Sequence, residues 1–228
     1  MGDNPPAEDD RPVVFTFTFG NDWYQSQFQS LHSRLLNNLF ERCTLRHAKT
    51  AQQALALFTE NDSPRAVFVA DSAIMNSRNE VVSQRLVQYV TDGGIVIFGG
   101  TFSNIVDHEK LDVFFGRTWD VPWEAGSQQR TTLSLNLAAV NPSLRNKLPA
   151  SYSQKALFLQ GVERHESWYL PTTESVIESY APLPGPVADL TETPVVFASF
   201  GDGHIGYIGD LSAEEGTDAA VLAMMGLL

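Results

Sequence analysis

The feature that most constrains the fold is an alternation of short apolar runs with amphipathic stretches over the first two-thirds of the chain. The apolar runs are VVFTFTF (13–19), AVFVAD (66–71) and GIVIFGG (94–100), and CTLRHA (43–48) is a further short strand between the first two. Between them, apolar residues recur every three or four positions, as on one face of a helix, and the first such stretch covers 23–40. Apolar strands separated by helices are typical of a parallel sheet covered on both faces. The alternation predicts an α/β fold.

From Gly116 onward the pattern changes to shorter segments separated by proline and glycine. TTLSLN (131–136), ALFLQG (156–161) and SVIESYAPL (175–183) predict an added antiparallel β section in the C-terminal half. The later stretch VVFASFGDGHIGYIGD (195–210) is typical of two strands joined by a glycine turn. A final helix over 219–225 is apolar nearly all round, so we expect it to be buried.

The chain shows one compositional boundary. Residues 1–11 are acidic and proline-rich, so we expect a disordered lead-in, and they lack the basic and apolar regions of a secretory signal. No linker interrupts residues 12–228, which we predict to form a single domain.

Charge and cysteine content exclude several classes of partner. The chain has 27 acidic and 15 basic residues, a formal net charge of −12, so it lacks the clustered lysine and arginine that nucleic acids and anionic membranes require. No apolar run approaches the ~20 residues that cross a bilayer. The single cysteine, Cys43, rules out an internal disulfide and fits a reducing compartment. We predict a cytoplasmic protein that binds neither nucleic acid nor membrane.

Three stretches resemble proteins of the ThuA-like family. YVTDGGIVIFGGTFS (89–103) is similar to their strand followed by a glycine pair, and PVVFASFGDGHIGYIGDL (194–211) is similar to their late hairpin. GYIGDLSAEEGTDAAVLAMMGL (206–227) resembles the ending of small fungal proteins with this fold. The resemblance implies the class I glutamine amidotransferase-like fold, which is flavodoxin-like.

The sequence departs from that family at the catalytic positions. Class I amidotransferases carry Gly-x-Cys-x-Gly after the fourth strand, whereas the corresponding turn here is Gly99-Gly100-Thr101-Phe102-Ser103. Cys43 belongs to an earlier strand, and the late loop offers Asp210 and Glu214 but no His-x-Glu. ThuA-like proteins often have a histidine near the turn, and the sequence shows none nearby. Because the cysteine of this turn is absent, we expect a domain without glutaminase activity.

Candidate ligand-binding residues follow the strands, because open parallel sheets bind ligands at the carboxyl ends of their strands. They are Asn21, Asp22, Gly99, Gly100, Thr101 and Asp210. Trp119, Trp123 and Arg130 are three more candidates, which we expect in a long loop, the tryptophans lining a pocket and Arg130 holding a carboxylate. The alternative is that the aromatic rings pin the loop to the core and Arg130 pairs with an acid.

Thr101 and Ser103 are the candidate nucleophiles, and Glu214, Glu215, Asp210 or His108 is the candidate base that an alcohol needs. Helix capping is the alternative role for both hydroxyls. The carboxylates Asp22, Asp71, Asp210 and Glu214 are also the type that binds Mg²⁺ or Ca²⁺ if they converge, but residues after strands commonly cap helices. We predict no metal and no cofactor.

The favoured function is a catalytically degenerate amidotransferase-like domain that binds a small molecule or a protein partner at the carboxyl ends of the strands. The alternative is a hydrolase that uses Ser103 or Thr101 with an acidic base on a carbohydrate-like substrate. A third hypothesis is assembly, as a homodimer through the antiparallel section.

Overall fold

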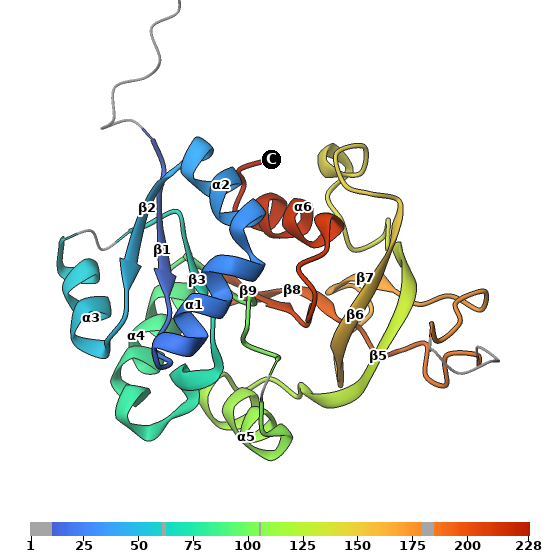
Figure 1. Ribbon diagram of the computed structural model, residues 1–228, viewed down its shortest axis with the longest axis horizontal. Coiled ribbons are helices and arrows are strands. Elements are labelled where there is room, and N and C mark those ends of the chain that lie inside the picture. Colours follow the sequence, from blue (N-terminus) through green and yellow to red (C-terminus); the bar gives the residue numbers. More distant parts are fainter. Residues whose placement is uncertain (1–10, 61–62, 105, 179–184) are drawn as a thin grey trace, which may run out of the picture.

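The computed structural model describes residues 11–60, 63–104, 106–178 and 185–228. These residues form one nine-stranded sheet (Figure 1). Its order is β2 (Thr44–Ala48), β1 (Val13–Phe17), β3 (Ala66–Val69), β4 (Ile95–Phe98), β9 (Gly203–Ile208), β8 (Val195–Phe200), β7 (Ser167–Leu170), β5 (Glu124–Leu135) and β6 (Ser151–Gln160). The predicted lead-in lies outside the described residues except for Arg11, whose guanidinium donates to the Phe40 carbonyl.

The sheet has a parallel and an antiparallel half. The strands β2, β1, β3, β4 and β9 are parallel, in the 2-1-3-4-5 arrangement of flavodoxin-like folds, and β8, β7, β5 and β6 continue antiparallel. The predicted fold class is therefore confirmed. Of the predicted segment 175–183, residues 175–178 are described and 179–184 are not.

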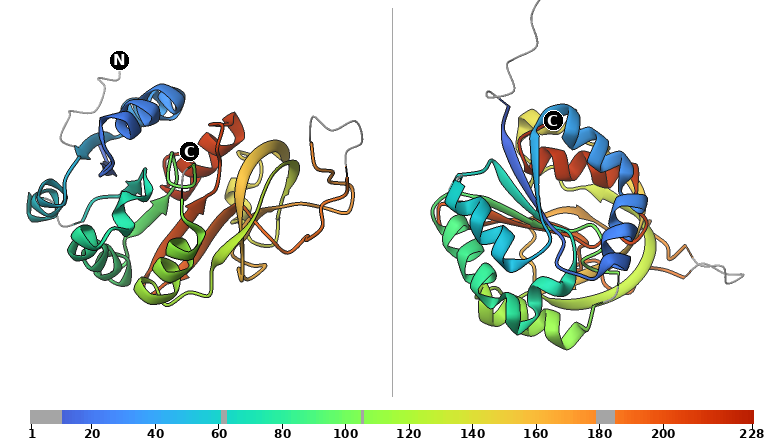
Figure 2. Two further views of the ribbon diagram at one scale, coloured as in Figure 1. Left: turned by 60° about the horizontal axis from the view of Figure 1, so that its bottom comes forward. Right: turned by 60° about the vertical axis from the view of Figure 1, so that its left-hand side comes forward.

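Helices cover both faces of the parallel half (Figure 2). One layer contains α1 (Asp22–Leu31), α2 (Ser33–Arg42) and α6 (Glu215–Met224), and the other contains α3 (Ala51–Glu60), α4 (Glu80–Thr91) and α5 (His108–Thr118). Alternate strand residues supply the two cores: Phe15 packs toward α3, and Val14 packs in the α2 layer. As predicted, the last helix is buried along most of its length.

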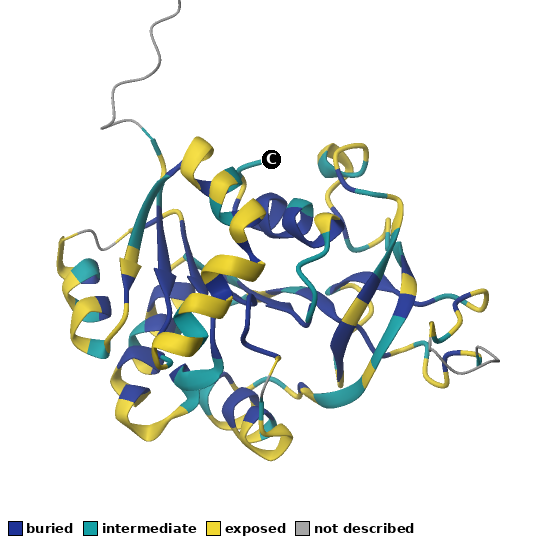
Figure 3. Cartoon of the chain, viewed as in Figure 1, coloured by how far each residue is buried: buried dark blue, intermediate teal, exposed yellow. Residues whose placement is uncertain are grey.

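Helix α1 buries fewer side chains than its neighbours α2 and α6. It buries a single side chain, Phe28, and its other residues are exposed or half-buried (Figure 3). The stretch predicted as helical over 23–40 is two helices, with His32 at their junction.

The antiparallel half curls back onto the loop that follows β9. An isolated bridge joins Ala156 of β6 to Asp210 in that loop, and a second joins Leu159 of β6 to Thr193, just before β8. The prediction of a long loop containing Trp119, Trp123 and Arg130 is wrong. Helix α5 ends at Thr118 and β5 begins at Glu124, so Arg130 lies within a strand. No helix of the described residues combines the length and apolarity needed to span a membrane.

Candidate functional site

The glycine turn that follows β4 is filled by the protein's own side chains. Gly100 has a φ of +63°, and a Cβ at this position would lie 2.9 Å from the ring of Phe28. The Thr101 hydroxyl donates to the Ala70 carbonyl at 2.8 Å, and the Ser103 hydroxyl donates to the Tyr207 phenol oxygen at 2.9 Å. Both side chains are buried, so neither hydroxyl is presented to solvent as a nucleophile.

Helix capping, the alternative role for these two hydroxyls, belongs to another residue. Asp107 caps α5 by accepting from the backbone N–H of Lys110.

The Tyr207 phenol, which accepts from Ser103, in turn donates to the Leu157 carbonyl at 3.0 Å. Thr101 and Ser103 are thus parts of a buried hydrogen-bonded corner between β3, β4, β9 and β6.

A histidine lies against this turn, contrary to the expectation from the sequence. His32 is 3% exposed, and its ring centroid lies 5.4 Å from that of Phe28. Its Nε2 has no hydrogen-bond partner. Burial lowers the pKa of His32, and the nearby Asp210 carboxylate and Gly100 backbone oppose that shift. Sequence spacing could not reveal this residue, because it reaches the turn from the junction of α1 and α2.

Asp210 lies at the same rim as the glycine turn, since β4 and β9 are parallel neighbours. Its buried carboxylate accepts from the backbone N–H groups of Ser212 and Glu214 at 2.7 and 2.8 Å and from the Thr217 hydroxyl. These bonds shape the loop that enters α6, and they use both carboxylate oxygens. The geometry assigns Asp210 a structural role in this loop.

A cavity of about 420 Å³ opens at the carboxyl ends of β1 and β3. This is the place where the strand order reverses, the usual ligand position of an open α/β sheet. Its lining includes Gly20, Asn21, Asp71, Arg78, Asp107 and Lys110. Asn21 also caps α1 by accepting from the N–H groups of Trp23 and Tyr24, whereas Asp22 is exposed in the first turn of that helix.

Asp71 is the buried carboxylate of this cavity. It accepts from the backbone N–H groups of Gly20 at 3.0 Å and Ala73 at 2.9 Å. Burial raises its pKa above the usual range, while these hydrogen bonds and the positive charge of Arg78 act in the opposite direction. Asp71 therefore links the segments after β1 and β3 that form the cavity wall.

A second cavity of about 410 Å³ shares Arg78 with the first. Its other lining residues include Phe19, Lys49 and Thr50, at the carboxyl ends of β1 and β2. Sequence reasoning missed Lys49, Arg78 and Lys110, because they come from three separate segments and belong to no recognisable motif.

Trp119 and Trp123 belong to the core and not to a pocket. Both are essentially unexposed. The Trp119 ring packs edge-on against Phe98 and Phe200, and the Trp123 ring packs against Phe115. The structure therefore replaces the predicted pocket with the alternative, in which aromatic side chains tie the segment between α5 and β5 to the core.

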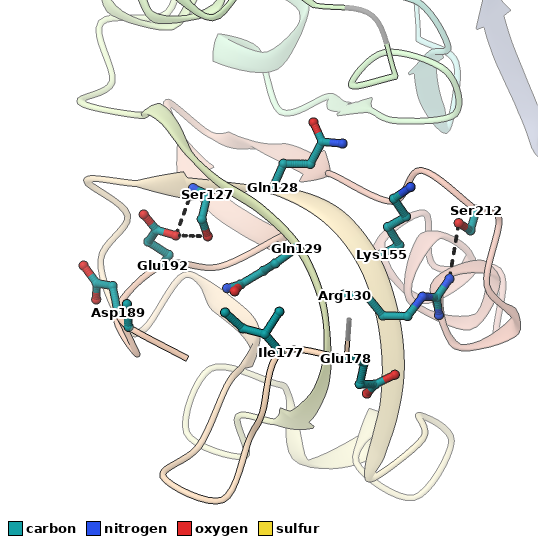
Figure 4. Close-up of a pocket in the computed structure, with 11 residues that line it drawn as sticks. Ser127, Gln128, Gln129, Arg130, Lys155, Ile177, Glu178, Asp189, Glu192 and Ser212 are labelled. Atoms are coloured by element: carbon teal, nitrogen blue, oxygen red, sulfur yellow. Dashed lines mark hydrogen bonds between the residues drawn. The ribbon is translucent and has the colours of Figure 1, made fainter. Parts of the chain in front are cut away.

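Arg130 lines a third cavity, of about 1050 Å³, beside β5 (Figure 4). Its guanidinium pairs with Glu214 at 2.7 Å and reaches Ser212 and Ser153 at 3.3 Å. Glu214 is thus paired with a cation and is not positioned as a base for Ser103.

Lys155 of β6 lies opposite Arg130 in the ladder. The Arg130 carbonyl accepts from the Glu178 N–H, and the Lys155 carbonyl accepts from the Leu211 N–H. The backbone polar groups of the two residues therefore point away from the partner strand. The two residues therefore form a non-hydrogen-bonded pair, in which side chains approach most closely. Acidic residues balance this cationic pair: Glu178, Asp189 and Glu192 line the same cavity.

The carboxylates proposed as metal ligands do not converge. Asp71 and Asp210 use their oxygens on backbone N–H groups at different strand ends, and Glu214 pairs with Arg130. Within the described residues, no group of three or more His, Cys, Asp or Glu side chains could hold a metal ion.

Comparisons with known proteins identify the fold. No protein-family model matches the sequence, and no curated protein is similar to it in sequence. A ThuA-like protein from Bacteroides uniformis has a similar structure, with a TM-score of 0.59 and 11% identity over 96% of this chain and 93% of that chain. A ThuA-like protein from Parabacteroides merdae has a TM-score of 0.52 and 12% identity over 95% and 89%.

A β-galactosidase from Halorubrum lacusprofundi also contains a similar region. The TM-score is 0.52 at 17% identity, covering 96% of this chain but 30% of the enzyme. At identities this low, the comparisons show the fold alone, which this chain shares with ThuA-like proteins, and they carry no activity with them.

Proposed function

We propose that this chain, on the fold that it shares with ThuA-like proteins, is a catalytically degenerate amidotransferase-like domain that binds a small molecule. The binding site that we propose is the cavity at the carboxyl ends of β1 and β3, lined by Gly20, Asn21 and Asp71. A cavity of about 420 Å³ is within the usual range for small-molecule sites.

One observation carries this proposal: the hydroxyls at the glycine turn are buried and already donate to protein oxygens. A nucleophilic turn must instead present its side chain to substrate beside a free base. Two of the candidate bases are committed, Asp210 to its own loop and Glu214 to Arg130. The same rim offers an open cavity one strand away, so binding is the function that the geometry supports best.

Labelling of Ser103 distinguishes the binding proposal from the hydrolase alternative. Our proposal predicts that a fluorophosphonate probe leaves the wild-type protein unlabelled, because the Ser103 hydroxyl is buried against Tyr207. Ammonia release from glutamine should likewise equal the buffer rate. Labelling that is lost in Ser103→Ala would support the hydrolase and contradict our proposal.

Binding can be located by nuclear magnetic resonance with a fragment library. We expect amide shifts to change at Gly20, Asn21 and Ser72 and to stay unchanged at 99–103. The variant Asn76→Trp, in the exposed cavity wall, should abolish these changes. The control Asn104→Trp, exposed beside the glycine turn, should preserve them. Changes centred on 99–103, or a library without any binder, would contradict the proposal.

Three further predictions rest on the sequence alone: the similarity to fungal proteins, a cytoplasmic location, and a homodimer through the antiparallel section. Light scattering at micromolar concentration tests the last of these. A monomer mass of about 25 kDa would remove assembly as a function.

A further inference from the structure

The lining of the β1/β3 cavity and its neighbour has a charge that is opposite to that of the chain. Acidic residues outnumber basic ones 27 to 15 in the whole sequence. The two cavities together contain three cationic side chains, Lys49, Arg78 and Lys110, and two carboxylates, Asp71 and Asp107. Basic side chains are therefore concentrated at one small part of the rim.

These carboxylates are engaged and the cations are not. Asp71 and Asp107 accept from backbone N–H groups, so they stabilise the local chain. Among the described residues, none of the three cations makes an ion pair or a side-chain hydrogen bond. The charge of Arg78 reaches Asp71 only as a longer-range interaction.

Arg78 holds the central position among the three. It follows the short 3-10 helix η2 (Ser72–Met75) and lies in η3 (Ser77–Asn79), where it lines both cavities. Lys49 lines only the cavity at β1 and β2, and Lys110 lines only the cavity at β1 and β3. A ligand in either cavity would therefore meet Arg78 and one lysine.

We infer that the ligand of this site carries an anionic group, a phosphate ester or a carboxylate, which Arg78 binds where the two cavities meet. The inference rests on the proposed function, because it names the chemical class of the molecule bound at that site. A planar guanidinium can donate two parallel hydrogen bonds to either kind of anion. The lysine in the occupied cavity adds a second positive charge.

Isothermal titration with three probes tests this inference: ribose 5-phosphate, glucuronate and ribose. We expect at least one anionic probe to bind about tenfold or more tightly than ribose, and its affinity to fall as salt is raised. A preference between the two anionic probes distinguishes a phosphate from a carboxylate ligand.

Variants then assign the residues. Arg78→Gln should weaken the anionic probe about tenfold or more, and the exposed control Arg117→Gln, at the far end of α5, should stay within about twofold. One of the two lysine variants, Lys110→Gln or Lys49→Gln, should also weaken binding of the anionic probe, by less than Arg78→Gln does. The lysine whose loss weakens binding identifies the cavity that holds the rest of the ligand.

The failure of this inference is distinguishable from that of the proposed function. If ribose and the anionic probes bind equally and Arg78→Gln changes neither affinity, the inference of an anionic ligand is wrong. Fragment-induced shifts at Gly20 and Asn21 would still support the proposed binding site. Absence of anionic binding at millimolar concentration would also overturn the inference. Absence of both probe binding and fragment shifts would overturn both.

Discussion

Two regions at the carboxyl ends of the parallel strands differ in accessibility: the glycine turn after β4 and the loops after β1 and β3. After β4, the glycine turn is covered by Phe28 and His32, and its hydroxyls are bonded inside the protein. After β1 and β3, the rim opens into a cavity with unpaired cations. The contrast shows that a glycine turn at the end of a strand does not by itself make a site, since neighbouring side chains decide whether it is accessible.

The largest expected effect concerns the side chain that covers the glycine turn. Phe28→Ala removes the only buried residue of α1 and should lower the free energy of unfolding by about 3–5 kcal/mol. Urea unfolding measures this change. Trp23→Ala in the same helix, 54% exposed, should cost less than about 1 kcal/mol. Equal small losses in both variants would show that Phe28 does not hold α1 on the turn.

A smaller loss is expected from the loop beside the turn. Asp210→Asn weakens an acceptor of three hydrogen bonds and should destabilise the fold by about 2–3 kcal/mol. The exposed hairpin variant Asp202→Asn provides the control and should change stability by no more than about 0.5 kcal/mol. A change in ligand affinity without a loss of stability in Asp210→Asn would instead place Asp210 in the binding site.

The pH dependence of stability probes His32. Because burial lowers its pKa in the folded state, the unfolded chain takes up the proton at a higher pH, near 6.5. Stability from the neutral ring is therefore complete above about pH 6.5 and declines as the pH falls below it. His32→Gln should flatten this decline between about pH 7.5 and 5.5, whereas the control His165→Asn should not. An unchanged slope in His32→Gln would contradict the burial of a neutral ring at the turn.

The smallest expected effect is the Arg130–Glu214 coupling. A double-mutant cycle with Arg130→Gln and Glu214→Gln should give about 0.5–1 kcal/mol, because both side chains are about one-third exposed. The more exposed Arg46–Glu60 pair should couple more weakly, and salt should reduce both values. Zero coupling at low salt would leave Glu214 free to act on a ligand.

The fold could be predicted because local patterns report it. Apolar runs such as 66–71 form strands that are buried on both faces, and the change of pattern after Gly116 marks the antiparallel half. The proposed site could be predicted only in part. Asn21 follows a strand and lines a cavity. Arg78, Lys49 and Lys110 line neighbouring cavities only because the strands are ordered β2-β1-β3, and hydrophobic periodicity does not determine strand order.

The residues near the glycine turn show a second limit. The burial of Trp119 depends on where α5 ends, and a tryptophan in a core or at a pocket has the same sequence signal. His32 reaches the turn through the junction of two helices, a bend that the apolar spacing over 23–40 conceals.

A crystal of the protein soaked in selenate and measured at the selenium absorption edge would locate the anion-binding position. We expect one anomalous peak beside Arg78, in the cavity between β1 and β3, and no peak at Gly99 to Ser103. A peak at the glycine turn, with Arg78 unoccupied, would mean that the turn has kept its function and that the cavity is not the site.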